Sequence, residues 1–330
     1  MTRVKPLFWY TGGKAKLFTI YYPFFEGLHP EHCIDYFGGS GTMSLWFHQL
    51  YPQAKVYLNE IDPALYKLFQ CMQEEYEEFK KWLHTIDSVY SRRKEFGDKK
   101  SCYYEFRDQE YNLTQYFPYE KISPEERIRI ACKHISEENM RMMLKNNEKK
   151  DMTKEEYQNH KGKNSTREHA FYFFLRTLSF SGMNVRNKKG EYTSAPGIRF
   201  PMQPVYDPER LEAFKAMLDH AELFNTDYRQ LDIQRPKSLH YFDPPYVDSI
   251  QDLFTSRFGW DETEELCEYV QRVSAHSTVF MSNYDHPRLK KLLKGFAWYT
   301  FPAVGGMQRN KRKEPVREIL FYKIHPSIAG

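Results

Sequence analysis

Residues 33–41 read CIDYFGGSG, an apolar run that ends in three glycines and a serine. The apolar part predicts a strand over residues 33–37, and the glycines end it because they let the backbone turn sharply and let a ligand come close. Residues 42–50, directly after the turn, predict a helix. A strand, a glycine turn and a helix in this order are typical of an α/β sheet that holds a small molecule at the carboxyl end of its first strand.

Strands and helices alternate on both sides of this stretch. Further strands are predicted over residues 55–60, 222–225, 238–242, 277–282, 296–301 and 317–324. Such alternation implies right-handed crossovers and a parallel sheet, but no helix separates the last two strands, so that pair is expected to be antiparallel. The predicted fold class is therefore α/β, with a seven-stranded, mostly parallel sheet that suits a nucleotide cofactor.

The alternation is interrupted in the middle of the chain. One helix is predicted to begin at Asp62-Pro63, with apolar positions at helical spacing through Ile86. From there to residue 206 the sequence is mainly helical, apart from a hairpin or loop over residues 187–197, which are rich in Lys, Gly, Ser and Pro. We therefore expect one domain in two parts, residues 1–84 and 207–330, with a helical domain of residues 85–206 inserted.

The composition excludes several classes of protein. With 17% aromatic and 41% hydrophobic residues, the 330-residue chain is not disordered. Its five cysteines are far apart and form no C-x-x-C pair, so neither a disulfide scaffold nor a zinc site is expected, and no other metal pattern is present. The first residues lack the apolar core of a signal peptide, and no run reaches membrane length. A soluble, cytoplasmic protein is expected.

The net charge of +4 does not by itself indicate nucleic-acid binding, but basic residues gather in two places. One group is Arg186, Lys188 and Lys189, and the other is the run Arg309, Lys311, Arg312, Lys313 and Arg317. Either group could contact phosphates, and a solvated loop without a partner is the alternative for both.

Two further features point to chemistry at the ends of strands. Glu60 ends the second predicted strand about 20 residues after the glycines, where an acid commonly holds a ribose diol; a capping or surface carboxylate is the alternative. Asp243-Pro244-Pro245-Tyr246 follows the strand of residues 238–242. Its two prolines remove two backbone donors and stiffen the chain. A carboxylate and carbonyl acceptors beside a ring suit the exocyclic amine of a planar base, and a rigid turn that only ends the strand is the alternative.

Four stretches, in this order, resemble the DNA adenine N6-methyltransferases of the GATC-methylating, Dam-like α group. They read WYTGGK at residues 9–14, DYFGGSG at 35–41, NEIDP at 59–63 and DPPY at 243–246. The resemblance implies a Rossmann-like methyltransferase fold with an inserted recognition domain, S-adenosylmethionine as cofactor and double-stranded DNA as partner. The activity it implies is methylation of adenine N6. Methylation of RNA adenine or of cytosine N4, and a DNA-binding protein without turnover, are the alternatives. A monomer or a weak dimer is expected.

The resemblance also implies roles for individual residues. Those assigned to the cofactor are Tyr10, Lys14, Asp35, Phe37, Gly39, Glu60, Asp227 and Asp243. The implied catalytic residues are Asp243, Pro244, Pro245 and Tyr246: the Asp243 carboxylate and the Pro244 carbonyl accept the N6 hydrogens of a flipped-out adenine that stacks on Tyr246.

The implied DNA contacts are Trp9, Phe180, Ser181, Met183, Arg186, Lys188 and Lys189. An apolar wedge near Phe180 would fill the gap left by the extruded base. Trp9 stands where the family usually has a DNA-reading lysine, and Ser181-Gly182 replaces the usual Asn-Gly pair. The recognition sequence therefore stays open, as does the biological role as a restriction partner, a phage counter-defence or a housekeeping mark.

Overall fold

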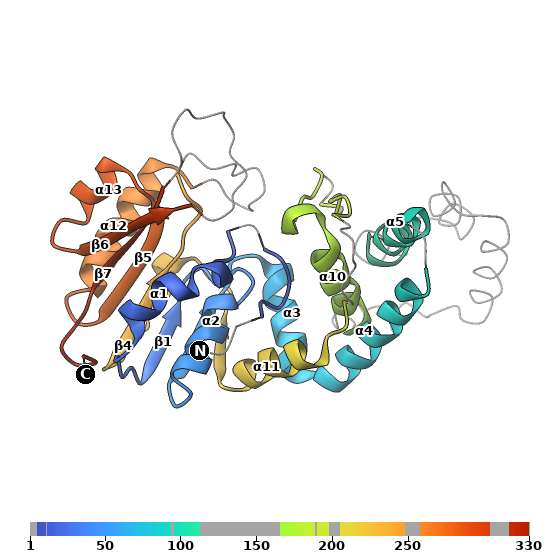
Figure 1. Ribbon diagram of the computed structural model, residues 1–330, viewed down its shortest axis with the longest axis horizontal. Helices are drawn as coiled ribbons and strands as arrows, with labels where there is room; N and C mark the ends of the chain where they lie inside the picture. Colours follow the sequence, from blue (N-terminus) through green and yellow to red (C-terminus); the bar gives the residue numbers. More distant parts are fainter. Residues whose placement is uncertain are drawn as a thin grey trace. The chain divides into compact units, whose positions relative to one another are not determined.

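The computed structural model describes residues 5–10, 12–93, 96–112, 166–188, 190–197, 205–247, 258–303 and 317–329. The chain divides into two compact units. The colours of Figure 1 follow the sequence and identify the segments of each unit. The first consists of Met1–Glu74 and Asp207–Gly330, and the second of Glu75–Tyr206.

The first unit is built on a seven-stranded sheet with the strand order β3-β2-β1-β4-β5-β7-β6. Figure 1 labels β1, β4, β5, β6 and β7. Its strands are β1 (His32–Asp35), β2 (Lys55–Asn59), β3 (Ala221–Phe224), β4 (Ser238–Phe242), β5 (Thr278–Tyr284), β6 (Ala297–Pro302) and β7 (Arg317–Lys323). Neighbouring strands are parallel except at β7, which is antiparallel to both β5 and β6. The predicted seven-stranded, mostly parallel sheet with an antiparallel end pair is confirmed.

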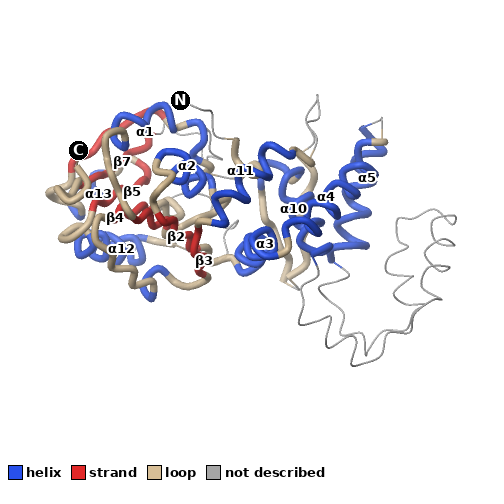
Figure 2. The backbone as a smooth tube through the Cα atoms, turned by 90° about the horizontal axis from the view of Figure 1, so that it is seen from below, coloured by secondary structure: helices blue, strands red, loops and turns tan. Residues whose placement is uncertain are grey.

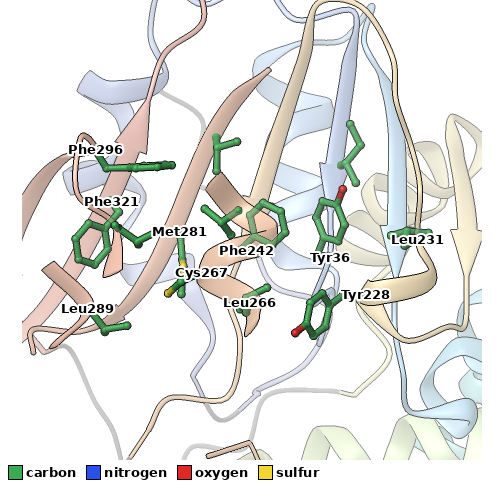
Figure 3. Packing of buried hydrophobic residues seen from close by; sticks show 14 of the residues in the cluster. Tyr36, Tyr228, Leu231, Phe242, Leu266, Cys267, Met281, Leu289, Phe296 and Phe321 are labelled. Carbon is green, nitrogen blue, oxygen red and sulfur yellow. The ribbon is translucent and has the colours of Figure 1, made fainter. Parts of the chain in front are cut away.

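Helices cover both faces of this sheet, because successive side chains of a strand point to opposite sides. On one side lie α1 (Phe18–Phe25) and α2 (Thr42–Leu50): the ring centroids of Phe25 and Phe280 are 4.0 Å apart, and those of Phe47 and Tyr241 are 5.9 Å apart. On the other side lie α12 (Trp260–Val273) and α13 (Pro287–Leu292), as Figure 2 shows. Figure 3 shows the apolar cluster on that side, where Phe242 and Met281 pack with side chains of both helices.

The helix predicted from Asp62 through Ile86 is in fact two helices, α3 (Pro63–Glu74) and α4 (Tyr76–Ser91). Glu75 lies between them with φ −124° and ψ 34°, outside helical geometry. The apolar spacing continues across this residue because both helices bury one face. The break lies where the chain leaves the first unit. On the first-unit side, α3 packs with α11 (Pro208–Asp219).

The second unit is helical, with one hairpin. Its described helices are α4, α5 (Phe96–Glu105), the π-helix η2 (Phe106–Tyr111), α10 (Thr166–Leu178) and the single turn η4 (Phe180–Gly182). The predicted hairpin or loop is a hairpin, in which the Thr193 amide donates to the Val185 carbonyl at 2.8 Å and the Asn187 amide to the Glu191 carbonyl at 3.0 Å.

No helix in the described ranges is both long and apolar enough to cross a membrane. The same ranges contain no group of three or more His, Cys, Asp or Glu residues that could hold a metal ion. Four cysteines, at positions 33, 71, 102 and 267, are buried and free, and Cys132 lies outside the described residues.

Candidate active site

Three polar side chains meet near the carboxyl ends of β1, β4 and β5. Asp35 ends β1, Asp243 directly follows β4, and Ser282 lies in the second half of β5. The carboxyl ends of parallel strands share one edge of a sheet, and the strand alternation turns Asp35 and Ser282 toward the side covered by α1 and α2. The sheet therefore gathers acids and hydroxyls at the edge where α/β proteins bind small molecules.

Asp243 is held at both carboxylate oxygens. The Lys14 ammonium lies 2.7 Å from Oδ2, and the Ser282 hydroxyl donates to Oδ1 at 2.7 Å. Lys14 is only 5% exposed, and it also donates to the Gly12 carbonyl at 2.8 Å. Two partners on two different elements fix the orientation of the carboxylate.

The ring of Tyr246 is fixed from several directions. Its hydroxyl donates to Glu318 Oε2 at 3.3 Å, its edge meets the ring of Tyr284 with centroids 4.8 Å apart, and Lys14 Nζ lies 5.0 Å from its centroid. Burial raises the pKa of the Tyr246 hydroxyl well above its ordinary value, and the charges of Asp243 and Glu318 raise it further. The hydroxyl is therefore a neutral donor. Pro244, directly after Asp243, is buried and has no amide hydrogen to donate.

Asp35 is a buried acid with one unused oxygen. Oδ2 accepts a hydrogen bond from the Ser44 hydroxyl at 2.9 Å, whereas Oδ1 has no hydrogen-bond partner among the described residues. Burial raises the pKa of Asp35 to about 7; the bond from Ser44 lowers it, and the charge of Asp243 raises it. A buried, unpaired acceptor of this kind is costly unless a donor joins it.

Glu60 is tied to the glycine turn. Its carboxylate accepts from the Gly39 amide at 2.6 Å and from the Asp62 amide at 2.8 Å. Burial raises the pKa of Glu60 to about 8, and the nearby Asp62 charge adds to the rise. Gly39 has a φ of +53°, and a Cβ there would lie 3.0 Å from the ring of Tyr10. The structure thus brings Tyr10, Gly39 and Glu60 together.

Phe37 and Asp227 lie apart from Asp243 and the residues in contact with it, Lys14, Tyr246 and Ser282, which together are called the Asp243 cluster. The Phe37 ring packs against Tyr228 and Phe258, with centroids 5.6 Å and 6.1 Å away, on the side of the sheet that α12 covers. Asp227 follows β3, is 40% exposed and pairs with Arg229 at 2.8 Å. The structure therefore places both residues along the carboxyl edge but away from Asp243.

Several polar residues in contact with these candidates were missed by the sequence reasoning. Ser44 and Ser282 donate to the two aspartates, and Glu318 accepts from Tyr246. Asn59 donates to the carbonyls of Tyr36 and Thr226, both at 3.0 Å, and so joins the loop after β1 to the loop after β3. For Asn59, Ser282 and Glu318 the available signal was a polar residue near one end of an otherwise buried strand; Ser44 lies in α2 and carried no such signal.

The candidate DNA contacts fall in both units. Trp9, in the first unit, is 48% exposed, and Lys16 Nζ lies 5.0 Å from its ring. In the second unit Phe180 is 47% exposed on the η4 turn, which continues through Ser181 to Met183, and Ser181 has a φ of +52°. A bulky apolar side chain is thus presented by a strained turn.

Basic residues of the hairpin differ in their surroundings. The Arg186 guanidinium donates to the Tyr111 hydroxyl at 2.9 Å and to the Gly190 carbonyl at 3.0 Å, so it braces the hairpin. Lys188 is exposed at the hairpin tip. Lys189 and residues 309–313 of the second basic run lie outside the described residues, while Arg317 donates to the Thr300 carbonyl at 3.0 Å.

Comparison with known families adds an independent finding. Residues 10–305, nearly the whole chain, match the model of the D12 class N6 adenine-specific DNA methyltransferases. This range contains Lys14, Asp243 and Ser282 and every residue for which the resemblance implies a role except Trp9; the second basic run and Glu318 lie beyond it. No protein with a curated function matches the chain.

Proposed function

Since the chain belongs to the D12 class N6 adenine-specific DNA methyltransferases, we propose that its Asp243–Tyr246 segment methylates N6 of a flipped-out adenine in duplex DNA. The observation that carries this assignment is the Asp243 carboxylate, held by Lys14 and Ser282 beside the fixed ring of Tyr246. Acceptors beside a flat ring suit an amino group on a stacked base.

The residues at the end of β1 fit S-adenosylmethionine, which supplies a methyl group already activated by a positively charged sulfur. The buried Oδ1 of Asp35 suits a cationic amine, because such a donor would satisfy the unpaired acceptor and favour the ionised carboxylate. Glu60 suits the ribose hydroxyls. The glycine turn under Tyr10 allows close approach of a ligand. Lys14, Phe37 and Asp227 complete the proposed cofactor set, with Lys14 linking it to Asp243.

The chain's acceptors would then activate the base. Adenine N6 is a poor nucleophile because its lone pair is delocalised into the ring. When Asp243 and the Pro244 carbonyl accept its two hydrogens, the lone pair becomes available for attack. Transfer would join the activated methyl group to N6 and leave the electron pair of the broken C–S bond on sulfur, and the Asp243 carboxylate would take one N6 proton.

Recognition is assigned to the inserted residues 85–206 and to Trp9. A base inside a duplex cannot reach the Asp243 carboxylate, so it must leave the stack. An exposed apolar side chain such as Phe180, with Ser181 and Met183 beside it, suits the gap that remains. Lys188 and Lys189 suit phosphates or base edges.

The test is methyl transfer from labelled S-adenosylmethionine to unmethylated duplex DNA, with the product nucleosides identified by mass spectrometry. N6-methyladenine should appear with the wild-type chain and be absent with Asp243→Ala, while circular dichroism shows the fold retained. A near-normal rate in the Asp243→Ala variant would overturn the mechanism. N4-methylcytosine, or methylation of RNA alone, would contradict the proposed substrate.

A further inference from the structure

Behind Asp243 lies a short chain of buried hydroxyl groups. The Ser282 hydroxyl oxygen is 2.7 Å from Asp243 Oδ1 and 3.1 Å from the Tyr241 hydroxyl oxygen. Ser282 and Tyr241 are both completely buried, and they come from the neighbouring strands β5 and β4. The Tyr21 ring of α1 is buried next to them.

The direction of these hydrogen bonds follows from the groups themselves. An ionised carboxylate only accepts, so the single hydroxyl hydrogen of Ser282 goes to Asp243. The Ser282 oxygen is then an acceptor, and the Tyr241 hydroxyl donates to it. Burial raises the pKa of Tyr241 well above its ordinary value, so this hydroxyl keeps its hydrogen. The chain therefore runs in one direction, from Tyr241 through Ser282 to Asp243.

The two partners of Asp243 differ in rigidity. Ser282 belongs to a strand whose backbone is paired with β4 on one side and β7 on the other. Lys14 reaches Oδ2 on a long side chain from a three-residue helix, and it also contacts the Gly12 carbonyl and the Tyr246 ring. An incoming amine could therefore replace Lys14 at Oδ2, while Ser282 stays on Oδ1.

We propose that Ser282 and Tyr241 are positioning residues for methyl transfer. Ser282 holds Oδ1 so that Oδ2 faces the adenine amine, and Tyr241 holds Ser282 in the rotamer that donates to Asp243. This inference rests on the proposed catalytic role of Asp243. Neither residue touches the substrate, so their effect should be on the rate of the chemical step and not on ligand binding.

A matched control exists at the opposite end of the same two strands. The Ser238 and Ser277 hydroxyl oxygens are 2.8 Å apart and buried, at the amino ends of β4 and β5. Ser277→Ala removes a buried, hydrogen-bonded hydroxyl at the other end of the sheet, away from Asp243, Tyr241 and Ser282. It reports what the loss of a buried hydroxyl does to stability alone.

The test compares Ser282→Ala, Tyr241→Phe, the double variant, Ser282→Thr and Ser277→Ala in single-turnover assays at saturating DNA and S-adenosylmethionine. Loss of a hydrogen bond to a charged group should slow transfer by about 10- to 100-fold in Ser282→Ala. Tyr241→Phe should slow it by about 3- to 10-fold, the size expected for a neutral hydrogen bond.

Adding Tyr241→Phe to Ser282→Ala should have no further effect, because Tyr241 acts through Ser282. Ser282→Thr should restore most of the rate, and Ser277→Ala should retain the wild-type rate.

The dissociation constants for DNA and S-adenosylmethionine should stay within about twofold of wild type in all these variants. A Ser282→Ala rate within about twofold of wild type, when Asp243→Ala is inactive, would overturn the inference and leave the proposed function intact. An active Asp243→Ala variant would overturn the proposed function itself. Additive effects of the two substitutions would show that no hydroxyl chain operates. If Ser282→Ala does not fold, Tyr241→Phe decides, because it keeps the ring and loses only one oxygen; a wild-type rate there counts against the proposal.

Discussion

Asp35 and Glu60 show how burial changes the chemistry of a single residue. Their folded-state pKa values are raised to about 7 and about 8, from ordinary values of 3.8 and 4.5, and burial is the largest cause for both. Between about pH 4 and pH 8 these two carboxyl groups therefore hold more protons in the folded protein than in the unfolded chain. These two acids consequently stabilise the fold below their unfolded pKa values, and that contribution disappears as the pH rises through 7 to 8.

We expect the melting temperature of the ligand-free protein to fall between about pH 6.5 and pH 8, where Asp35 and Glu60 still titrate in the folded protein while His240, whose pKa burial lowers to about 3, is already mostly neutral in both states. Asp35→Asn should flatten this slope, because it removes one of the two titrating groups. The control is Glu222→Gln, which changes an exposed acid on β3 and should leave the slope as it is. Differential scanning calorimetry over this pH range is the measurement, and a wild-type melting temperature that does not change with pH would contradict the expectation.

Gly41 is constrained by both backbone and space. Its φ is +69°, and a Cβ at this position would lie 2.7 Å from the Phe214 ring. Gly41→Ala should therefore reduce the free energy of unfolding by about 2–4 kcal/mol, from the left-handed backbone and the overpacking together. Gly97, in α5, offers the comparison, because no atom lies within 4 Å of a Cβ there. Gly97→Ala should be neutral or slightly stabilising in the same urea titration; equal destabilisation of both variants would refute the packing argument.

At the scale of elements, the sequence predicts the bounds of strands better than it predicts which strands pair. All seven strands lie within about two residues of their predicted bounds, because short apolar runs bounded by turns are a local signal. The insertion of β7 between β5 and β6 depends on which strands pair, and no local pattern encodes that choice. The break at Glu75 was missed for a similar reason, since the apolar spacing on its two sides remains in phase.

The hairpin of the second unit is held to η2 and the residue after it by side chains. The Asn112 amide donates to the Tyr192 carbonyl at 3.0 Å and accepts from the Tyr192 amide at 2.9 Å, as a neighbouring strand would. Asn112→Ala removes two hydrogen bonds of about 1 kcal/mol each, so we expect DNA affinity to fall by up to about 30-fold through a loosened hairpin. Fluorescence anisotropy with labelled DNA measures this loss. The affinity for S-adenosylmethionine, measured by calorimetry, should be unchanged.

Lys188→Ala is the variant to compare with Asn112→Ala, because the Lys188 side chain is exposed and supports no other part of the hairpin among the described residues. Removing one lysine–phosphate interaction should lower the slope of log affinity against log salt by about 0.9, which Asn112→Ala should not do. If the two variants changed the salt slope equally, the assignment of a structural role to Asn112 and of phosphate binding to Lys188 would be wrong.

At the scale of the whole molecule, the candidate site is assembled from distant segments. Lys14 and Glu318 stand near opposite ends of the sequence, yet one pairs with Asp243 and the other accepts from the Tyr246 next to it. The glycine turn and the Asp-Pro-Pro-Tyr segment were identified from sequence because each is a local pattern. Of their partners, Tyr10 and Lys14 were assigned to the cofactor from the resemblance, whereas Ser282 and Glu318 were not identified, because a buried serine or glutamate becomes significant only once the sheet has brought it to the same edge.

The same assembly leads to an expectation for the basic run at residues 309–313, which lies outside the described residues. The run links β6 to β7, and the carboxyl edge of the sheet carries the Asp243 cluster. With a net charge of only +4, attraction to DNA must come from local groups of basic residues and not from the total charge.

The variant Arg312→Ala with Lys313→Ala should therefore lower the salt slope of DNA binding by nearly 2, about 0.9 for each phosphate that is no longer neutralised. Lys55→Ala with Lys237→Ala, at the amino ends of β2 and β4, is the matched control and should leave the slope unchanged. Anisotropy titrations across a range of salt concentrations measure both slopes, and equal slopes for wild type and the Arg312 and Lys313 variant would remove this run from the DNA interface.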